Sequence, residues 1–273
     1  MPIVTTNDGT ELYVKDWGQG RPVVLVHGWP LNADSWEHQA LHLATNGCRV
    51  IAYDRRGFGR SGQPWTGYDY DTLADDLACV IDALGLRDAT LAGFSMGGGE
   101  VARYMSRHDG RGVAKAALIS SVVPFMLKTG DNPDGVDGDV FDGMKDGLRK
   151  DRPQFIRDFL EGFYGNGTEA GGVSDGVLHW AWAMAMQASP KATIDCVDAF
   201  GRTDFRPDLA AFDLPVLVVH GTGDETVPID PSGRAAARSI ADGTLKEYEG
   251  APHGLTATHA DRLSRDLLEF VQG

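Results

Sequence analysis

The sequence predicts an α/β fold, with a mostly parallel central sheet, helices on both of its faces, and a helical cap inserted into it. Apolar runs typical of buried strands alternate with helical patterns through the first part of the chain. This alternation stops after Pro124 and resumes with the apolar run DLPVLVVHG. We therefore expect residues 1–125 and 212–273 to form the core, and residues 126–211 to form the helical cap.

The strands of the first half follow from two patterns. The N-terminal segment alternates polar and apolar residues around Asp8 and Gly9, a pair that is typical of a hairpin turn. Later runs are almost continuously apolar, as in strands buried on both faces of a parallel sheet. These runs cover residues 21–28, 48–54, 88–95 and 113–121.

Helices are expected between these strands. Asp34 and Glu37 resemble a capping box at the start of the first helix, and Gly47 fits the position after its end. Apolar residues at helical spacing predict two more helices before residue 110, at 70–85 and 96–108.

The cap sequence contains glycine-rich loops and helical stretches but no strand pattern. Its helices are expected at 140–150, 152–164 and 177–189. Beyond the cap, the patterns predict a strand within residues 213–221, a helix at 232–241, a strand from residue 243 and a final helix at 261–271.

Charge and composition argue against several classes of function. The formal net charge is −14, and so acidic a surface repels nucleic-acid phosphates and anionic membranes. No apolar stretch is long enough to span a bilayer and no signal peptide is recognisable, so we expect a cytoplasmic protein. The cysteines have no metal-ligand spacing and are expected to be reduced thiols; they are Cys48, Cys79 and Cys196.

The stretch GFSMG places Ser95 at a predicted turn from strand to helix. Gly93 and Gly97 relieve crowding at such a turn, so that the serine hydroxyl is exposed above the sheet. The N–H groups that begin the following helix favour negative charge developing at the same point. We therefore predict that Ser95 is a catalytic nucleophile rather than an incidental turn serine.

A serine nucleophile needs a base and an acid that orients the base. His253 and Asp224 both lie after predicted strands, and the order Ser95, Asp224, His253 matches nucleophile, acid and base in hydrolases built on such sheets. Glu225 is the alternative acid. The remaining histidines are expected to have structural or surface roles; they are His27, His38, His42, His108, His179, His220 and His259.

An oxyanion hole requires two backbone N–H donors. Met96 follows the nucleophile and supplies one, while Trp29, in the loop after the strand at 21–28, is the candidate for the other. His27 and Gly28 are expected to shape this loop. The glycine-rich loop that contains Asp54, Arg55 and Arg56 carries no convincing base, and we expect structural roles for these three residues.

The chain resembles the cofactor-free bacterial haloperoxidases (perhydrolases) and arylesterases of the α/β-hydrolase fold. The segments that carry the resemblance are HGWPLNADSWE, YDRRGFGRSGQPWTGYDYDTLADDL, GFSMGGGEVARY, TDFRPDL, VHGTGD and EGAPHGLTATHA. The resemblance implies the same triad and oxyanion donors, small aryl or short-acyl esters as substrates, and no metal or other cofactor. It also implies perhydrolysis, in which hydrogen peroxide attacks the acyl-enzyme and releases a halide-oxidising peracid, and it allows a homo-oligomer.

Other activities of the same fold remain open. Haloalkane dehalogenases and epoxide hydrolases place an aspartate where this chain has Ser95, which argues against both. A lactonase or γ-lactamase would use the same triad, and so would a carbon–carbon hydrolase or a peptidase. A non-catalytic ligand receptor would tolerate loss of triad residues, yet all of them are present.

The substrate pocket is expected to be apolar. Its predicted lining residues are Phe94, Pro30, Phe125 and Val227. The segment HWAWAMAMQ and the cap residues Phe155, Phe159 and Phe163 suggest an apolar cap face, although packing within the cap explains them equally well. We also hypothesise that Pro30, which restrains Trp29, aims the Trp29 carbonyl at incoming peroxide. The alternative is that Pro30 only starts the following turn.

Overall fold

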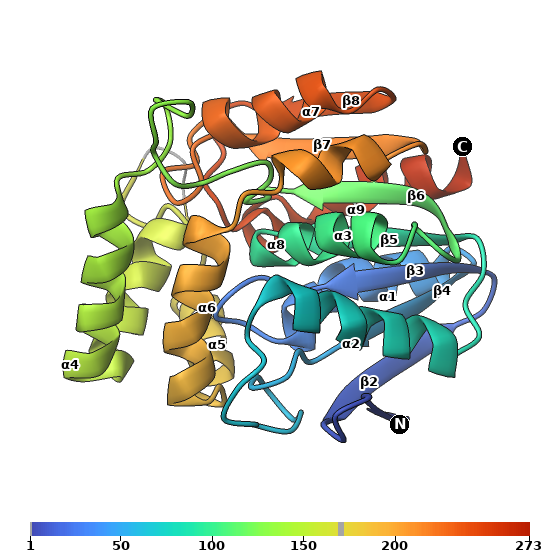
Figure 1. The fold of residues 1–273 in the computed structure, drawn as a ribbon, viewed down its shortest axis with the longest axis horizontal. Helices are drawn as coiled ribbons and strands as arrows, with labels where there is room; N and C mark the ends of the chain where they lie inside the picture. Colours follow the sequence, from blue (N-terminus) through green and yellow to red (C-terminus); the bar gives the residue numbers. More distant parts are fainter. Residues whose placement is uncertain (1, 169–171) are drawn as a thin grey trace.

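An eight-stranded sheet forms the centre of the molecule, in the order β1-β2-β4-β3-β5-β6-β7-β8 (Figure 1). The computed structural model describes residues 2–168 and 172–273. β2 pairs antiparallel with β1 and β4, and all the other neighbours are parallel, which confirms the predicted fold class. The strands are β1 (Ile3–Thr5), β2 (Glu11–Gly18), β3 (Arg21–Val26), β4 (Cys48–Tyr53), β5 (Ala89–Phe94), β6 (Val113–Ile119), β7 (Val216–Gly221) and β8 (Gly243–Tyr248).

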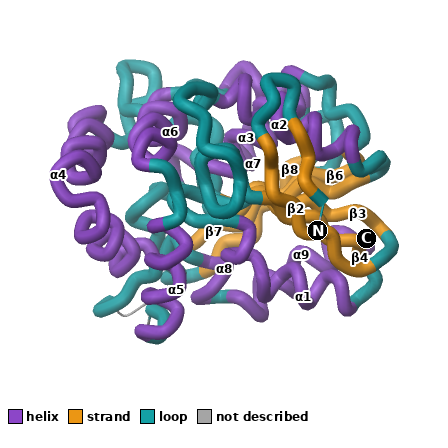
Figure 2. The backbone as a smooth tube through the Cα atoms, turned by 90° about the horizontal axis from the view of Figure 1, so that it is seen from below, coloured by secondary structure: helices purple, strands orange, loops and turns teal. Residues whose placement is uncertain are grey.

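Helices cover both faces of the sheet. α2 packs on α3 over one face and α1 packs on α9 over the other, so the strands lie between two helical layers (Figure 2). These core helices are α1 (Glu37–Thr45), α2 (Tyr70–Ala83), α3 (Met96–Arg107), α7 (Ala235–Ser239), α8 (Leu255–Thr258) and α9 (Ala260–Gln272). Short helical turns are η1 (Ala33–Trp36), η2 (Arg206–Ala211) and η3 (Asp230–Arg234).

The central strands are buried on both faces, as their apolar sequences predict. Every residue of β5 and β7 is buried, and so are the last four residues of β3. Because β3 to β8 run parallel, their carboxyl ends meet at one edge of the sheet. The loops that follow β3, β5, β7 and β8 therefore converge there.

Three helices lie beyond this edge, on the left in Figure 1. They are α4 (Gly138–Phe163), α5 (Asp175–Met186) and α6 (Pro190–Arg202), and α4 packs on both of the others. The helical stretches expected at 140–150 and 152–164 are two halves of α4, joined by a kink at Asp151, which has φ −158° and ψ 82°. Pro153 follows the kink at a position where a continuous helix would need its missing N–H.

The end of the predicted cap segment packs on the core. η2 lies against α3, where Arg103 on α3 forms an ion pair with Asp208 at 3.0 Å. Phe205 just before η2 contacts Tyr70, with 4.6 Å between the ring centroids. The helices that stand over the carboxyl edge are therefore α4, α5 and α6.

The expected capping box at Asp34 is wrong. The Asn32 side chain accepts a hydrogen bond from the Asp34 backbone N–H, and η1 separates this cap from α1. The Asp34 carboxylate pairs instead with Lys15 and Arg60. The turn after α1 does match the prediction, because Gly47 has φ +84°.

Candidate active site

Ser95 sits in a crowded corner between β5 and α3. Its φ of +54° and ψ of −119° are strained values for a residue with a side chain. The corner needs its glycines, since a Cβ on Gly93 would lie 2.4 Å from the Gly97 carbonyl oxygen, and a Cβ on Gly97 would lie 2.4 Å from that of Val26. The strained backbone aims the hydroxyl at the carboxyl edge of the sheet, as the GFSMG pattern predicts.

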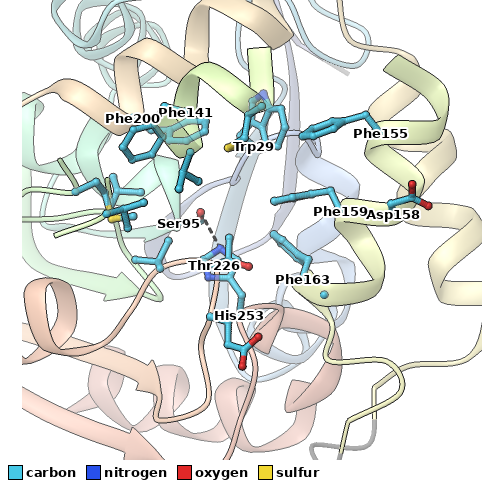
Figure 3. A pocket seen from close by; sticks show the side chains of 18 residues that line it. Trp29, Ser95, Phe141, Phe155, Asp158, Phe159, Phe163, Phe200, Thr226 and His253 are labelled. Atoms are coloured by element: carbon cyan, nitrogen blue, oxygen red, sulfur yellow. Dashed lines mark hydrogen bonds between the residues drawn. The ribbon is translucent and has the colours of Figure 1, made fainter. Parts of the chain in front are cut away.

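Three residues that are far apart in the sequence meet at this edge. His253 Nε2 lies 2.9 Å from Ser95 Oγ, and His253 Nδ1 lies 2.7 Å from Asp224 Oδ2. Figure 3 shows the hydroxyl of Ser95 turned towards the imidazole of His253. All three side chains are buried. Since Nδ1 donates to the carboxylate, Nε2 is left to accept the serine proton, which is the arrangement of an activated nucleophile.

Asp224 is held on both of its oxygens. Oδ1 accepts hydrogen bonds from the backbone N–H groups of Thr226 at 3.0 Å and Val227 at 2.8 Å. Burial alone would raise the pKa of this carboxyl, but His253 and His220 outweigh burial and lower the pKa to about 2. Asp224 is therefore an anion in the working pH range, and its charge lies against the His253 ring.

The alternative acid, Glu225, occupies a different place. Its side chain is exposed and lines the neighbouring cavity. Within the part of the chain that the structure describes, the carboxylate hydrogen-bonded to His253 belongs to Asp224.

His220 is a neighbour of the triad that sequence reasoning placed only in the core. It is fully buried, and its Nε2 lies 2.8 Å from the Val227 carbonyl oxygen and 3.3 Å from Asp224 Oδ2. The signal that could have found it is its position at the end of β7, four residues before Asp224. A short turn after β7 brings the Asp224 carboxylate back against the His220 ring.

The two expected oxyanion donors come from different elements. Met96 begins α3, so its N–H belongs to the first turn, where backbone donors have no partner within the helix. Trp29 lies in the loop after β3 and, like Ser95, lines the cavity. Its indole N–H donates to the Thr193 carbonyl at 3.0 Å, and its ring contacts Phe159 and Phe200. The Trp29 side chain thereby anchors this loop to α4 and α6.

A buried ion pair braces the same loop. Arg55 donates from Nε to Glu100 Oε2 and from Nη2 to the His27 carbonyl oxygen, both at 2.7 Å. Glu100 lies on α3, one turn beyond the nucleophile, so Arg55 links the Trp29 loop to the Ser95 helix. Arg56 pairs with Asp76 at 2.6 Å. These contacts give Arg55 and Arg56 the structural roles that we expected of them.

Comparison with known proteins identifies the family. Residues 21–260 match the family described as alpha/beta hydrolase fold. The chain belongs to this family. It is 50% identical to the non-heme chloroperoxidase CPO-A1 of Kitasatospora aureofaciens over 99% of each chain. It is 45% identical to the bifunctional esterase/perhydrolase DCH of Acinetobacter calcoaceticus over the whole of both. The crystal structure of bromoperoxidase from Bacillus anthracis is similar with a TM-score of 0.95, at 43% identity over 100% of this chain and 99% of that one.

These relatives confirm the resemblance to haloperoxidases and perhydrolases that the sequence motifs carry. Among residues 2–168 and 172–273 of this α/β hydrolase, no three histidine, cysteine, aspartate or glutamate side chains are grouped so that they could hold a metal ion. The described helices include none that is both long and apolar enough to cross a membrane.

A cavity of about 420 Å³ opens beside Ser95 and His253 in this α/β hydrolase (Figure 3). Phe155, Phe159 and Phe163 recur every four residues along α4 and turn their rings into it. Besides Ser95 and His253, its polar lining residues are Asp158, Glu225 and Thr226. The other lining residues are Trp29, Val122, Met126, Val136, Val140, Phe141, Met144, Gly162, Phe200 and Val227.

Three of the four predicted pocket residues do not line this cavity; only Val227 does. Phe94 is fully buried behind the triad, with its ring 5.2 Å from that of His253. The Arg206 guanidinium lies over the ring of Phe125, 5.0 Å from the ring centroid. Pro30 is buried inside a turn that the Leu31 N–H closes onto the Gly28 carbonyl.

The apolar segment HWAWAMAMQ does not face the cavity either. It forms most of α5, whose residues Ala181, Met184 and Ala185 are buried. The Trp182 indole donates to the Pro153 carbonyl on α4 at 2.9 Å. This segment holds the cap helices together, and α4 and α6 provide the cap side of the cavity.

Proposed function

We propose that this α/β hydrolase is a serine esterase for small aryl or short-acyl esters, and that hydrogen peroxide replaces water in its second half-reaction to give a peracid. The observation that carries the proposal is the hydrogen-bonded series Ser95–His253–Asp224 at the wall of an apolar cavity. Relatives named as chloroperoxidase and as esterase/perhydrolase, matched along their whole length, support it.

In the first half-reaction, Ser95 Oγ attacks the carbonyl carbon of the ester as His253 Nε2 takes its proton. Asp224 stabilises the resulting imidazolium through Nδ1–H. The backbone N–H groups of Trp29 and Met96 donate to the oxygen that becomes negative. The tetrahedral intermediate then expels the alcohol, which takes the proton from His253, and the acyl group remains on Ser95.

In the second half-reaction, His253 removes a proton from water or from hydrogen peroxide as that molecule attacks the acyl-enzyme. Loss of Ser95, reprotonated by His253, gives a carboxylic acid in the first case and a peracid in the second. Halide is then oxidised by the peracid. Every enzymatic step is a proton or acyl transfer between these groups, so the proposal assigns no step to a metal or other cofactor.

The acyl group fits an apolar, partly aromatic space. A volume of about 420 Å³ is in the range of small-molecule pockets. No lysine or arginine is among its described lining residues, whereas Asp158 and Glu225 are, so the cavity offers no partner for an anionic acyl group. We therefore propose uncharged aryl acetates and similar short-acyl esters as good substrates.

A substrate panel tests this proposal. Aryl esters, lactones and γ-lactams are each assayed with and without hydrogen peroxide, and peracid is measured by oxidation of a halide-dependent dye. We expect rapid aryl ester hydrolysis and peroxide-dependent peracid formation, both lost in Ser95→Ala and both retained after exhaustive chelation. Turnover confined to lactams or lactones would favour the alternative activities, and loss on chelation restored by one metal would contradict the mechanism.

A further inference from the structure

Two thioether side chains line the cavity in which the acyl-enzyme would form. They are Met126, which follows β6, and Met144, on α4. Their sulfur atoms are the yellow atoms of Figure 3. The other methionines that the structure describes, Met96, Met105, Met184 and Met186, are not among the lining residues.

We propose that Met126 and Met144 are oxidation sites, converted to methionine sulfoxide by peracid formed at Ser95 before it leaves the cavity. This inference rests on the proposed perhydrolase function, which supplies the oxidant. A thioether is a reactive target for a peroxide oxygen, and its sulfoxide is stable until a reductase removes it. Hydrolysis in water alone produces no oxidant and leaves both residues unchanged.

The chemistry balances without a further reagent. Hydrogen peroxide attacks the Ser95 acyl group and gives R–C(=O)–O–OH and free Ser95. The sulfur lone pair of methionine then attacks the terminal peroxy oxygen, the O–O bond breaks, and an S=O bond forms. Sulfur loses two electrons, the peroxy group gains them, and the proton of the peroxy group stays with the carboxylic acid R–COOH.

Confinement favours these two sulfurs over the others. One molecule held in a cavity of about 420 Å³ corresponds to a local concentration on the order of 4 M, far above any level that peracid reaches in the surrounding solution. The lining is mostly apolar, so the thioethers are the readily oxidised side chains that a new peracid meets alongside Trp29.

Oxidation should also change the enzyme. A sulfoxide adds a polar S=O dipole to a mostly apolar wall, and Met126, only 2% exposed, is largely shielded from the water that would solvate it. The cavity then binds apolar acyl groups less well. We expect activity to fall progressively during perhydrolysis, first as a rise in KM.

The chain contains its own matched controls. Met126 and Met184 are both 2% exposed, but only Met126 lines the cavity. Met144 and Met186 are both partly buried, but only Met144 lines it. An oxidant that arrives from bulk solution acts on the members of each pair according to their similar exposure. An oxidant made at Ser95 oxidises the cavity-lining member of each pair more than the other member.

The experiment measures oxidation of each methionine by peptide mass spectrometry after a fixed number of turnovers with aryl ester and hydrogen peroxide. We expect Met126 to be oxidised at least about tenfold more than Met184, and Met144 at least about tenfold more than Met186. The preference for cavity methionines should vanish in two controls that make no peracid: Ser95→Ala given ester and peroxide, and wild type given peroxide alone. It should also vanish in Ser95→Ala given ready-made peracid at the bulk concentration measured in the wild-type reaction.

Three results are distinguishable. If peracid forms and the paired methionines oxidise equally, the inference is overturned while the proposed function stands. If no peracid forms, the proposed function itself fails and the inference fails with it. The third result concerns the double variant Met126→Leu/Met144→Leu, whose activity is normalised to its own initial rate, as is that of wild type. This variant should lose activity several-fold more slowly than wild type during perhydrolysis. An equal rate of loss would show that cavity sulfoxides do not cause the inactivation.

Discussion

His220 shares the Asp224 carboxylate with His253. Its Nε2 lies 3.3 Å from Asp224 Oδ2 and 2.8 Å from the Val227 carbonyl oxygen. Since a carbonyl oxygen only accepts, His220 Nε2 carries a proton and donates it to Val227, and this N–H also lies beside the Asp224 carboxylate. Asp224 is thus held by a second histidine on the same oxygen that orients the first, which makes His220 a positioning residue for the triad.

We predict that His220→Phe lowers kcat about tenfold or more and leaves KM nearly unchanged, because the variant loses the N–H that lies 3.3 Å from the Asp224 carboxylate, and polar contacts to a charged group are worth about 1.5–3 kcal/mol. His220→Gln places an amide N–H near the former Nε2 and should restore part of kcat. Steady-state kinetics on aryl acetates measure both. A folded His220→Phe variant with wild-type kcat would show that His220 serves packing alone.

Triad substitutions should be severe and non-additive. We expect Ser95→Ala and His253→Ala each to lower kcat about a million-fold, and Asp224→Asn about ten-thousand-fold, because the three residues act as one unit. Combining two of them should cost little more than the worse single change. Ester turnover that survives in His253→Ala but is lost in a variant of another histidine would show that the base has been misassigned.

Asp224 should also make stability depend on pH. Its pKa falls from 3.8 to about 2 in the folded state, so the unfolded chain binds the proton first as the pH drops. The ionised carboxylate contributes about 2 kcal/mol to the free energy of unfolding above pH 4, and that contribution is lost between about pH 4 and pH 2.

Urea unfolding at a series of pH values tests this sign. The wild-type free energy of unfolding should fall more steeply below pH 4 than that of Asp224→Asn, which has no titrating group at this position. Parallel curves for the two proteins between pH 5 and pH 2 would argue that the Asp224 pKa is not lowered by folding.

Pro30 provides a test of peroxide selectivity. The ring restrains Trp29, whose carbonyl we hypothesise accepts a hydrogen bond from attacking peroxide. Pro30→Leu should lower the ratio of peracid formation to ester hydrolysis by about two- to tenfold, the value of one hydrogen bond, while hydrolysis persists. Pro30 lies buried in the turn closed by Leu31 N–H, so an unchanged ratio in a folded variant would leave it a turn residue only.

The sequence predicts which three side chains meet at the carboxyl edge because topology does most of the positioning. Ser95, Asp224 and His253 each follow a strand of one parallel sheet, and parallel strands bring their carboxyl ends together whatever the side chains between them. The GFSMG corner is local at Gly93, which the Gly97 carbonyl crowds, whereas Gly97 is crowded by the Val26 carbonyl at the end of the neighbouring strand.

The pocket wall depends on tertiary packing, which spacing alone does not reveal. Phe155, Phe159 and Phe163 share one face of α4, so their common direction was predictable. Phe125 and Phe94 are just as aromatic, yet Arg206 covers one and the triad histidine packs on the other. His220 sits in a fully buried strand, and only the turn after it places its imidazole against Asp224.

The central claim is that Ser95, activated by His253, carries the acyl group. A fluorophosphonate probe, followed by peptide mapping, tests it most directly, because the probe reacts covalently only with an activated nucleophile. We predict one label per chain, located on Ser95, abolished in Ser95→Ala and strongly slowed in His253→Ala. Labelling of another residue, or labelling of Ser95→Ala at the wild-type rate, would contradict the assignment of Ser95 as the nucleophile.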